Sequence, residues 1–197
     1  MEEDCKTICV YCGSSDKMLP AYLEAAQEMG RTIATRKMRL VYGAGMTGLM
    51  GAVADGALSQ GGEVIGVIPE IFNTPQLRHT RLTKLDVVAD MHTRKARMVA
   101  LADAFIALPG GYGTLDEFFE ILTWAQIGLH QKPIGLLNTR NYFAPLLAWV
   151  DHAAAEGFIY AEHRHLFTVH EEPWALLDLL QGHRPPANLA RWLTRDE

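Results

Sequence analysis

Hydrophobic residues follow two different spacings along the chain. Short apolar runs rich in β-branched and aromatic residues are typical of buried strands, and longer stretches with apolar residues every three or four positions are typical of helices that face a core. The predicted strands are Thr7 to Cys12, Leu40 to Tyr42, Val64 to Ile68, Leu85 to Val88, Ala104 to Leu108 and Pro133 to Leu137. The predicted helices are Ala21 to Lys37, Leu49 to Gln60, Met91 to Leu101, Leu115 to Ile127, Tyr142 to Glu156 and one near Trp174 to Leu180.

This alternation of strands and helices predicts the fold class. It is typical of an α/β protein, here a Rossmann-like three-layer α/β/α arrangement whose mostly parallel sheet is covered by helices on both faces. Ligands of such sheets bind beyond the carboxyl ends of the strands. We predict one Rossmann-like domain over residues 1–181 and a loosely packed C-terminal tail over residues 182–197, which contains Pro185-Pro186.

Composition and charge narrow the classes of function. With 197 residues, of which 49% are hydrophobic and 21% charged, the chain can bury a full core. A net charge of −5 argues against a broad nucleic-acid surface, because binding a phosphate backbone needs a basic face. The chain has no apolar run of about 18 residues, and Met1-Glu2-Glu3-Asp4 is acidic, unlike a signal peptide. We therefore expect a cytoplasmic protein that binds neither nucleic acid nor a membrane.

The cysteines and histidines give little support for a metal site. The three cysteines, Cys5, Cys9 and Cys12, are clustered near the N-terminus, and an odd cluster is a poor disulfide framework. Cys9 and Cys12 lie in an apolar run that is typical of a buried strand, and no second cysteine pair could complete a zinc site. His163 and His165 have no clustered acids or cysteines beside them in sequence. We expect no bound metal.

Three loops that follow predicted strands carry the candidate chemistry. They are Gly13-Ser14-Ser15, Gly43 to Gly48, and Pro109 to Gly113. In the last loop, a strand, a glycine turn and the start of a helix near Thr114 follow one another. Such a turn directs several backbone N–H groups and the positive end of a helix dipole to one place, which suits an anion such as phosphate.

The second loop has the Gly43-x-Gly45-x-x-Gly48 spacing of a dinucleotide-binding turn. A dinucleotide site also uses an acid about 20 residues further on, at the end of the next strand. Glu63 lies before that strand, and Pro69-Glu70 follows it slightly late. Contact with a mononucleotide phosphate and a purely structural tight turn both remain open for this loop.

Two further positions have both a functional and a structural interpretation. Asp90 is the expected N-cap of a helix whose first two turns carry Arg94, Lys95 and Arg97. Cations there oppose the helix dipole, so either an anionic partner compensates them or their long side chains extend into water. Thr114 and Glu117 fit the T-x-x-E capping box, in which Glu117 would only satisfy backbone N–H groups. The alternative makes Glu117 an acid one turn from the bound anion.

Two motifs resemble those of a known family. Pro109 to Glu117 matches PGGxGTxxE, and Met91-His92-Thr93-Arg94-Lys95 matches MHxRK. Together they resemble the LOG family, the cytokinin riboside 5′-monophosphate phosphoribohydrolases, long mislabelled as lysine decarboxylases. The resemblance extends from about Thr7 to Phe167 and includes Tyr11-Cys12-Gly13-Ser14-Ser15, Gly48-Leu49-Met50-Gly51, Val67-Ile68-Pro69 and Thr123-Trp124-Ala125-Gln126.

The resemblance implies an activity and a set of site residues. The expected reaction is hydrolysis of the N-glycosidic bond of cytokinin riboside 5′-monophosphates, and of AMP as a further candidate, to free base and ribose 5-phosphate. Arg94 and Glu117 are the expected catalytic pair. The residues expected to bind substrate or phosphate are Gly13, Ser14, Gly43, Gly45, Gln76, Lys95, Gly110, Gly111, Tyr112, Gly113, Thr114, Asp116 and Thr123. No cofactor is implied, and family members are typically homodimers with sites near the subunit interface.

The residue types suit this chemistry. Cleavage of a ribosyl–purine bond passes through an oxocarbenium-like state, which the Glu117 carboxylate can stabilise while it orients or deprotonates water. A bidentate contact from Arg94 can hold the substrate or orient Glu117. The chain departs from the family pattern at Ala44, Gln76, Thr93 and Asp116. Gln76 stands where relatives often carry a substrate-contacting glutamate, so the preference for base or sugar stays open.

Two other classes of function remain as alternatives. A nucleotide or phosphate-cofactor carrier could use the same glycine loops without cleaving its ligand, although the presence of both Arg94 and Glu117 disfavours it. A decarboxylase would need a lysine that binds pyridoxal phosphate, and no lysine of this sequence has a recognisable context for one.

Overall fold

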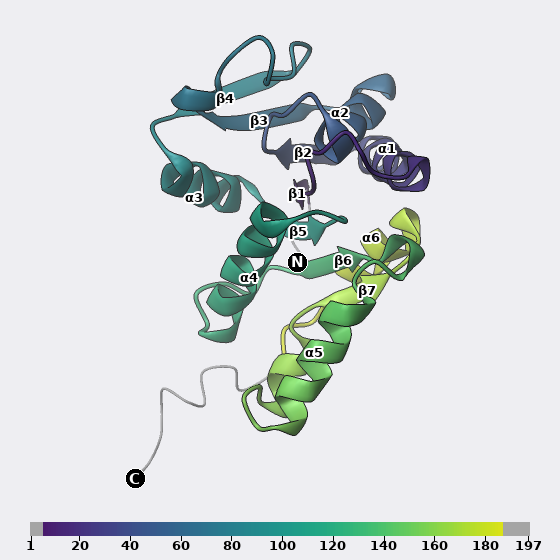
Figure 1. Ribbon diagram of the computed structural model, residues 1–197, viewed down its shortest axis with the longest axis vertical. Coiled ribbons are helices and arrows are strands. Elements are labelled where there is room, and N and C mark those ends of the chain that lie inside the picture. The colour runs from purple at the N-terminus through teal and green to yellow at the C-terminus, as the bar shows by residue number, and fades with distance from the viewer. Residues whose placement is uncertain (1–5, 187–197) are drawn as a thin grey trace.

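The computed structural model describes residues 6–186 and is organised around one sheet of seven parallel strands (Figure 1). The strand order is β4-β3-β2-β1-β5-β6-β7. The strands are β1 (Thr7–Tyr11), β2 (Arg39–Tyr42), β3 (Val64–Pro69), β4 (Lys84–Val88), β5 (Ala104–Ala107), β6 (Ile134–Leu137) and β7 (Thr168–His170). The chain therefore builds outward from β1 in one direction and then, from β5, in the other, which makes the β1/β5 boundary the topological switch point.

Helices cover both faces of the sheet, as predicted. They are α1 (Pro20–Thr35), α2 (Gly48–Ser59), α3 (Met91–Leu101), α4 (Tyr112–Gln126), α5 (Ala144–Ala155) and α6 (Pro173–Gln181). Three short 3₁₀ turns lie at Glu70–Phe72, Thr139–Asn141 and Ala161–His165. The α/β three-layer fold and its parallel sheet are thus confirmed.

Alternate residues of the central strands point into two separate cores. On β1, Ile8 and Val10 pack with apolar residues of α1, α2 and α6. Cys9 and Tyr11 point to the opposite face and pack with residues of α3, α4 and α5. Both faces of β1 are therefore buried, which explains why its sequence is continuously apolar rather than alternating.

Two details differ from the prediction. The edge strand β7 was not expected, because Thr168–His170 has only three half-buried residues and no apolar run to mark it. Helix α4 begins at Tyr112 rather than near Leu115, with Gly111 as its N-cap. The Tyr112-Gly113 pair has low helix propensity, which hid this first turn in the sequence.

The predicted tail lies largely outside the described residues, which end at 186. Helix α6 ends at Gln181, one residue before the predicted start of the tail. The single domain over residues 1–181 stays a prediction. Within residues 6–186 no helix combines the length and apolar character needed to cross a lipid bilayer.

Candidate active site

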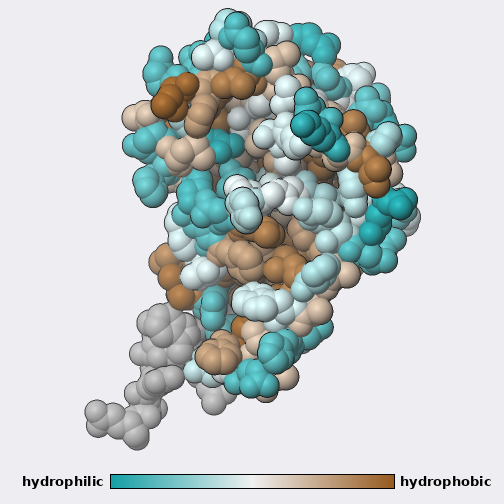
Figure 2. All heavy atoms as spheres, in the orientation of Figure 1, coloured by the Kyte–Doolittle hydropathy of each residue, from teal (hydrophilic) through white to brown (hydrophobic). Residues whose placement is uncertain are grey.

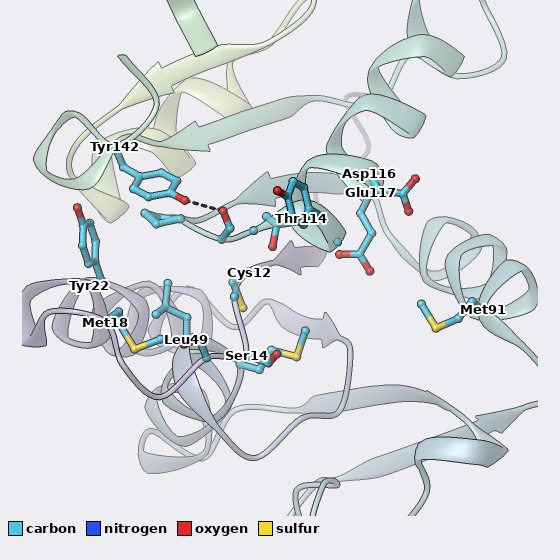
Figure 3. Close-up of a pocket in the computed structure, with 18 of the residues that line it drawn as sticks. Cys12, Ser14, Met18, Tyr22, Leu49, Met91, Thr114, Asp116, Glu117 and Tyr142 are labelled. Atoms are coloured by element: carbon cyan, nitrogen blue, oxygen red, sulfur yellow. Dashed lines mark hydrogen bonds between the residues drawn. The ribbon is translucent and has the colours of Figure 1, made fainter. Parts of the chain in front are cut away.

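A cavity of about 530 Å³ opens at the carboxyl ends of β1 and β5, where the strand order reverses (Figure 3). The loop after β1 and the loop after β5 lie against each other there, because the backbone N–H of Gly13 donates to the carbonyl of Pro109 at 3.1 Å. This is the place where doubly wound sheets bind their ligands. Most of the predicted site residues line the cavity, namely Gly13, Ser14, Arg94, Gly110, Gly111, Tyr112, Gly113, Thr114, Asp116 and Glu117.

The loop from Gly43 to Gly48 packs against the loop that follows β1. The backbone N–H of Leu49, in the first turn of α2, donates to the carbonyl of Gly13 at 3.0 Å. Gly48 has a φ of 60°, and a Cβ there would overlap the backbone of Ser14 and Ser15. A glycine is required at this position because the two loops approach each other so closely.

The start of α4 supplies backbone donors to the cavity. Because α4 begins at Tyr112, the N–H groups of its first turn have no acceptor within the helix. Gly111, Tyr112 and Gly113 are exposed on the cavity wall, and Tyr112 is 96% exposed. Together with the helix dipole, these free N–H groups suit an anion, and the phosphate contact expected of this loop stays a prediction.

The capping-box interpretation of Glu117 is wrong. Thr114 lies inside the first turn of α4 rather than at its N-cap, and the N-cap Gly111 has no side chain to bond. Glu117 is therefore in the second turn, where the backbone N–H groups are already engaged in the helix. Its carboxylate points toward the cavity (Figure 3), so the structure leaves it available for chemistry.

Arg94 and Glu117 form a buried pair on one side of the cavity. Arg94 Nη1 lies 3.3 Å from Glu117 Oε1, and the two residues are only 8% and 5% exposed. Arg94 Nε donates to the carbonyl of Val67 at 3.3 Å, which ties the guanidinium to the end of β3. A lysine could not make both contacts, because it lacks the planar fork of donors.

The environment of Glu117 changes its protonation. Burial raises the pKa of Glu117 to about 7, and this effect outweighs the opposing influence of the Arg94 charge. Asp116 adds to the rise, and Lys95 reduces it. A carboxyl group with a pKa near neutrality can exchange a proton at physiological pH, which is typical of a general acid or base.

Gly43 lies against Arg94, and its contact with phosphate stays a prediction. A Cβ at Gly43 would overlap Arg94 Nη2 and would lie 3.3 Å from the Met50 side chain. Neither Gly43 nor Gly45 is among the residues that line the cavity, and the space beside Gly45 is filled by the Met50 side chain. The first glycine of this loop thus provides the room in which the Arg94 guanidinium lies.

Three other predicted binding residues lie outside the lining of the cavity. Gln76 and Thr123 are both exposed, the former in the loop between β3 and β4 and the latter on α4. Lys95 Nζ lies 3.1 Å from Asp116 Oδ2 and 3.0 Å from Glu120 Oε1, so its charge is directed to α4 rather than into the cavity. Contact of these residues with substrate stays a prediction.

The sequence did not indicate the apolar end of the cavity. Met18, Tyr22, Leu49 and Tyr142 line this end, away from Glu117 (Figure 3). The Tyr142 hydroxyl donates to the carbonyl of Gly110 at 2.6 Å, and the rings of Tyr22 and Tyr142 meet edge to face at 5.8 Å. Tyr142 follows β6, so the rule that ligands bind at strand carboxyl ends could have pointed to it.

The predicted cysteine burial is confirmed for the two cysteines in β1 and just after it. Cys9 and Cys12 are both free and buried, and burial raises the pKa of each thiol above its usual range. Cys5 lies outside the described residues. Within residues 6–186 no cluster of three or more histidine, cysteine or acidic side chains has the arrangement to hold a metal ion.

The fold and the site together define a class: a doubly wound α/β protein with a glycine-lined cavity and a buried acid at its switch point. Comparison with known sequences places the chain within this class. A family model described as "Possible lysine decarboxylase" matches residues 50–180. A cytokinin riboside 5′-monophosphate phosphoribohydrolase of Rhodococcoides fascians is 55% identical over 155 residues, which cover 78% of this chain and 78% of that protein.

A relative from Arabidopsis thaliana with the same enzyme name is 44% identical over 185 residues, covering 94% of this chain and 87% of that protein. The chain therefore belongs to the LOG family of cytokinin riboside 5′-monophosphate phosphoribohydrolases. The family resemblance expected from the two motifs is thereby confirmed. These curated relatives carry a hydrolase name, whereas the decarboxylase wording belongs to the description of the family model.

Solved structures of other proteins share the fold. The molybdenum cofactor binding protein of Rippkaea orientalis superimposes with a TM-score of 0.70 at 23% identity, over 91% of this chain and 98% of that one. The molybdenum cofactor carrier protein of Chlamydomonas reinhardtii gives a TM-score of 0.68 at 22% identity, over 91% and 99% of the two chains. At this level of identity the likeness concerns the fold, not the ligand.

Proposed function

We propose that this protein hydrolyses the N-glycosidic bond of cytokinin riboside 5′-monophosphates and releases the free base and ribose 5-phosphate. The observation that carries the proposal is the buried Arg94–Glu117 pair at the edge of the glycine-lined cavity, in a chain 44% to 55% identical to enzymes of that name. A carrier needs the anion-binding loops but has no use for a buried carboxyl group with a pKa near 7.

The glycine loops would bind the 5′-phosphate. In this proposal the phosphate lies at the start of α4, against the backbone N–H groups from Tyr112 to Thr114. Binding energy from the phosphate, which does not react, then holds the ribose in place for attack at C1′. Substrates without the phosphate should lose this positioning and react more slowly.

Glu117 and Arg94 would carry out the cleavage. The ionised Glu117 carboxylate stabilises the positive charge that develops on the ribose as the bond to the base breaks, and it accepts a proton from the attacking water. The departing base takes up a proton from solvent, and Glu117 then returns the proton that it accepted to solvent, so that the carboxylate is restored. Arg94, held by the Val67 carbonyl, keeps the carboxylate oriented toward the cavity.

A direct comparison of substrates tests the proposal. Isopentenyladenosine 5′-monophosphate, AMP and isopentenyladenosine are offered separately, and free base and ribose 5-phosphate or ribose are quantified. We expect base release from isopentenyladenosine 5′-monophosphate and slower release from AMP. For isopentenyladenosine, which lacks the phosphate, we expect kcat/KM to be lower by roughly 100-fold or more. If no base is released and the nucleotides still bind tightly, the protein is a carrier and the proposal fails.

The pH dependence of kcat follows from the protonation of Glu117. Glu117 must be ionised to accept a proton from water, and burial raises its pKa to about 7. The rate should therefore increase about tenfold per pH unit below that value and level off above it. Steady-state kcat measured between about pH 5 and 9 checks this. A kcat that stays nearly constant down to about pH 5, as expected for an ordinary glutamate pKa of about 4.3, would show that burial does not raise the pKa of Glu117.

We also propose that the protein is a homodimer, as the family resemblance implies. Figure 2 shows apolar side chains gathered in the middle of one face, between α4 and α5. On these two helices the half-buried Phe119 and the 52% exposed Trp149 meet edge to face, with their ring centroids 5.8 Å apart. An exposed apolar surface of this kind is typical of a protein interface. Cytoplasmic location likewise stays a proposal.

The oligomeric state can be measured by sedimentation. We expect twice the 21.9 kDa chain mass for the parent protein and the single-chain mass for Trp149→Lys, because a charge would have to be buried in the interface. Trp174→Lys on α6 is the matched control, since Trp174 is similarly exposed on the other side of the sheet. If the Trp149→Lys variant is still a dimer, the interface does not include Trp149.

A further inference from the structure

Two neighbouring residues of α3 reach two different faces of α4. Arg94 pairs with Glu117, and the next residue, Lys95, contacts both Asp116 and Glu120. Asp116 and Glu120 are four residues apart and so lie on one side of α4, while Glu117 is turned by about 100° from Asp116. The two helices are therefore joined side by side by a buried ion pair and by a lysine held between two carboxylates.

The Lys95 contacts are partly protected from solvent. The Lys95 side chain is 12% exposed and that of Glu120 is 24% exposed, although Asp116 is 62% exposed. Ion pairs shielded in this way are less weakened by water and salt than pairs on an open surface. Lys95 lies outside the lining of the cavity, so its position suits contact with α4 better than contact with a ligand.

Lys95 also balances the charges around Glu117. Four charged groups influence the pKa of Glu117: Arg94 and Lys95 on α3 lower it, and Asp116 and Glu120 on α4 raise it. From the strand side, burial raises the pKa of Cys9, Tyr11 and Cys12, which keeps these groups neutral. The two neighbouring carboxylates favour the protonated form of Glu117, and Lys95 opposes them at short range.

We propose that Lys95 is a positioning residue: its ammonium holds α3 against α4, so that Arg94 stays beside Glu117, and offsets the charges of Asp116 and Glu120. This rests on the proposed function in one respect, that Glu117 is the group whose ionisation matters. The family resemblance implies substrate binding by Lys95, whereas the proposed role acts on the catalytic pair through the Lys95 contacts with Asp116 and Glu120 on α4.

Lys95→Met tests this role against a matched control. Removing the ammonium should shift the acidic limb of the kcat profile to higher pH by roughly half a unit or more. It should also lower the plateau value of kcat severalfold, with KM nearly unchanged. Arg97→Met is the control, because Arg97 pairs with Asp86 on the side of α3 away from α4, at 2.9 Å. Arg97→Met should change neither the pH of the acidic limb of the kcat profile nor the plateau value of kcat.

Two further variants give responses that simple loss of stability would not. Glu120→Gln removes a negative neighbour of Glu117 and should shift the limb in the opposite direction, to lower pH. Lys95→Arg keeps the charge and both carboxylate partners, so it should restore most of the parent profile. Opposite shifts from Lys95→Met and Glu120→Gln cannot arise from a common weakening of the fold.

The titration of Glu117 can also be followed without turnover, by carbon NMR of carboxyl-labelled glutamate in the free protein, with Glu117→Gln to assign the signal. The same upward shift in Lys95→Met is expected there. If the parent protein releases no base but the NMR shift occurs, the proposed function fails and the role of Lys95 stands. If the titration of Glu117 is the same in Lys95→Met as in the parent protein, the proposal is overturned. It is also overturned if Lys95→Met increases KM and leaves the pH profile unchanged, because Lys95 would then be a substrate contact.

Discussion

Replacing Glu117 by glutamine should abolish base release while substrate still binds. The amide keeps the size of the side chain but can neither accept a proton from water nor stabilise positive charge on the ribose as a carboxylate does. We expect kcat to fall by roughly 10²- to 10⁴-fold. The dissociation constant for isopentenyladenosine 5′-monophosphate should change much less, because the proposed phosphate contacts come from backbone groups at the start of α4. Rapid-quench kinetics and calorimetric titration check the two expectations.

Glu28→Gln is the matched control for this substitution. Glu28 also pairs with an arginine, Arg31, at 2.8 Å, but on the exposed side of α1. Its loss should leave kcat unchanged, since exposed pairs of this kind contribute little. If Glu117→Gln turned over at the parent rate, Glu117 would have no role in the chemistry and a different acid would have to be found.

Gly43→Ala should inactivate the enzyme through Arg94. The added methyl group would overlap the guanidinium at Nη2, and the nearby Met50 side chain limits any relief on that side. Overpacking a buried position costs about 1–3 kcal/mol. We therefore expect the Arg94 side chain to move away from Glu117, since this relieves its overlap with the added methyl group. Loss of that orientation should lower kcat/KM by roughly 100-fold. Steady-state kinetics and a crystal structure of the variant would report the rate and the new arginine position.

Gly182→Ala provides the corresponding control. A Cβ at Gly182 would lie 3.6 Å from the carbonyl of Asp178, which is an ordinary contact, and the backbone there has a φ of −84°. Its kinetics should match those of the parent. An active Gly43→Ala variant with Arg94 still beside Glu117 would show that the loop has more freedom than the structure indicates.

The sequence predicted the fold well because the central strands are continuously apolar and alternate with segments that have apolar residues at helical spacing. The order of strands and glycine loops was sufficient to place the cavity at the carboxyl ends of the strands. The start of α4 was misjudged because Tyr112-Gly113 resembles a loop, and that error produced the capping-box interpretation of Glu117. Local spacing describes hydrogen bonds within a helix, but it does not show where the helix begins.

Residue roles were harder to predict than residue positions. Gly43 fits a phosphate-binding pattern, but the clearance that it gives Arg94 depends on a side chain 51 positions away in the chain. Lys95 follows Arg94 in a motif that is expected to bind substrate, yet its ammonium contacts Asp116 and Glu120. The aromatic end of the cavity joins Tyr22 and Tyr142 from distant segments. Such relations depend on tertiary packing, which periodicity and motif spacing do not describe.

The most direct test of the central proposal is the product balance from isopentenyladenosine 5′-monophosphate. Free base, ribose 5-phosphate, riboside and inorganic phosphate are quantified over time with the parent protein and with Glu117→Gln. We predict free base and ribose 5-phosphate in equal amounts from the parent protein and almost none from the variant. Release of inorganic phosphate with intact riboside, or no product from the parent protein, would contradict the assignment of this site to N-glycosidic bond hydrolysis.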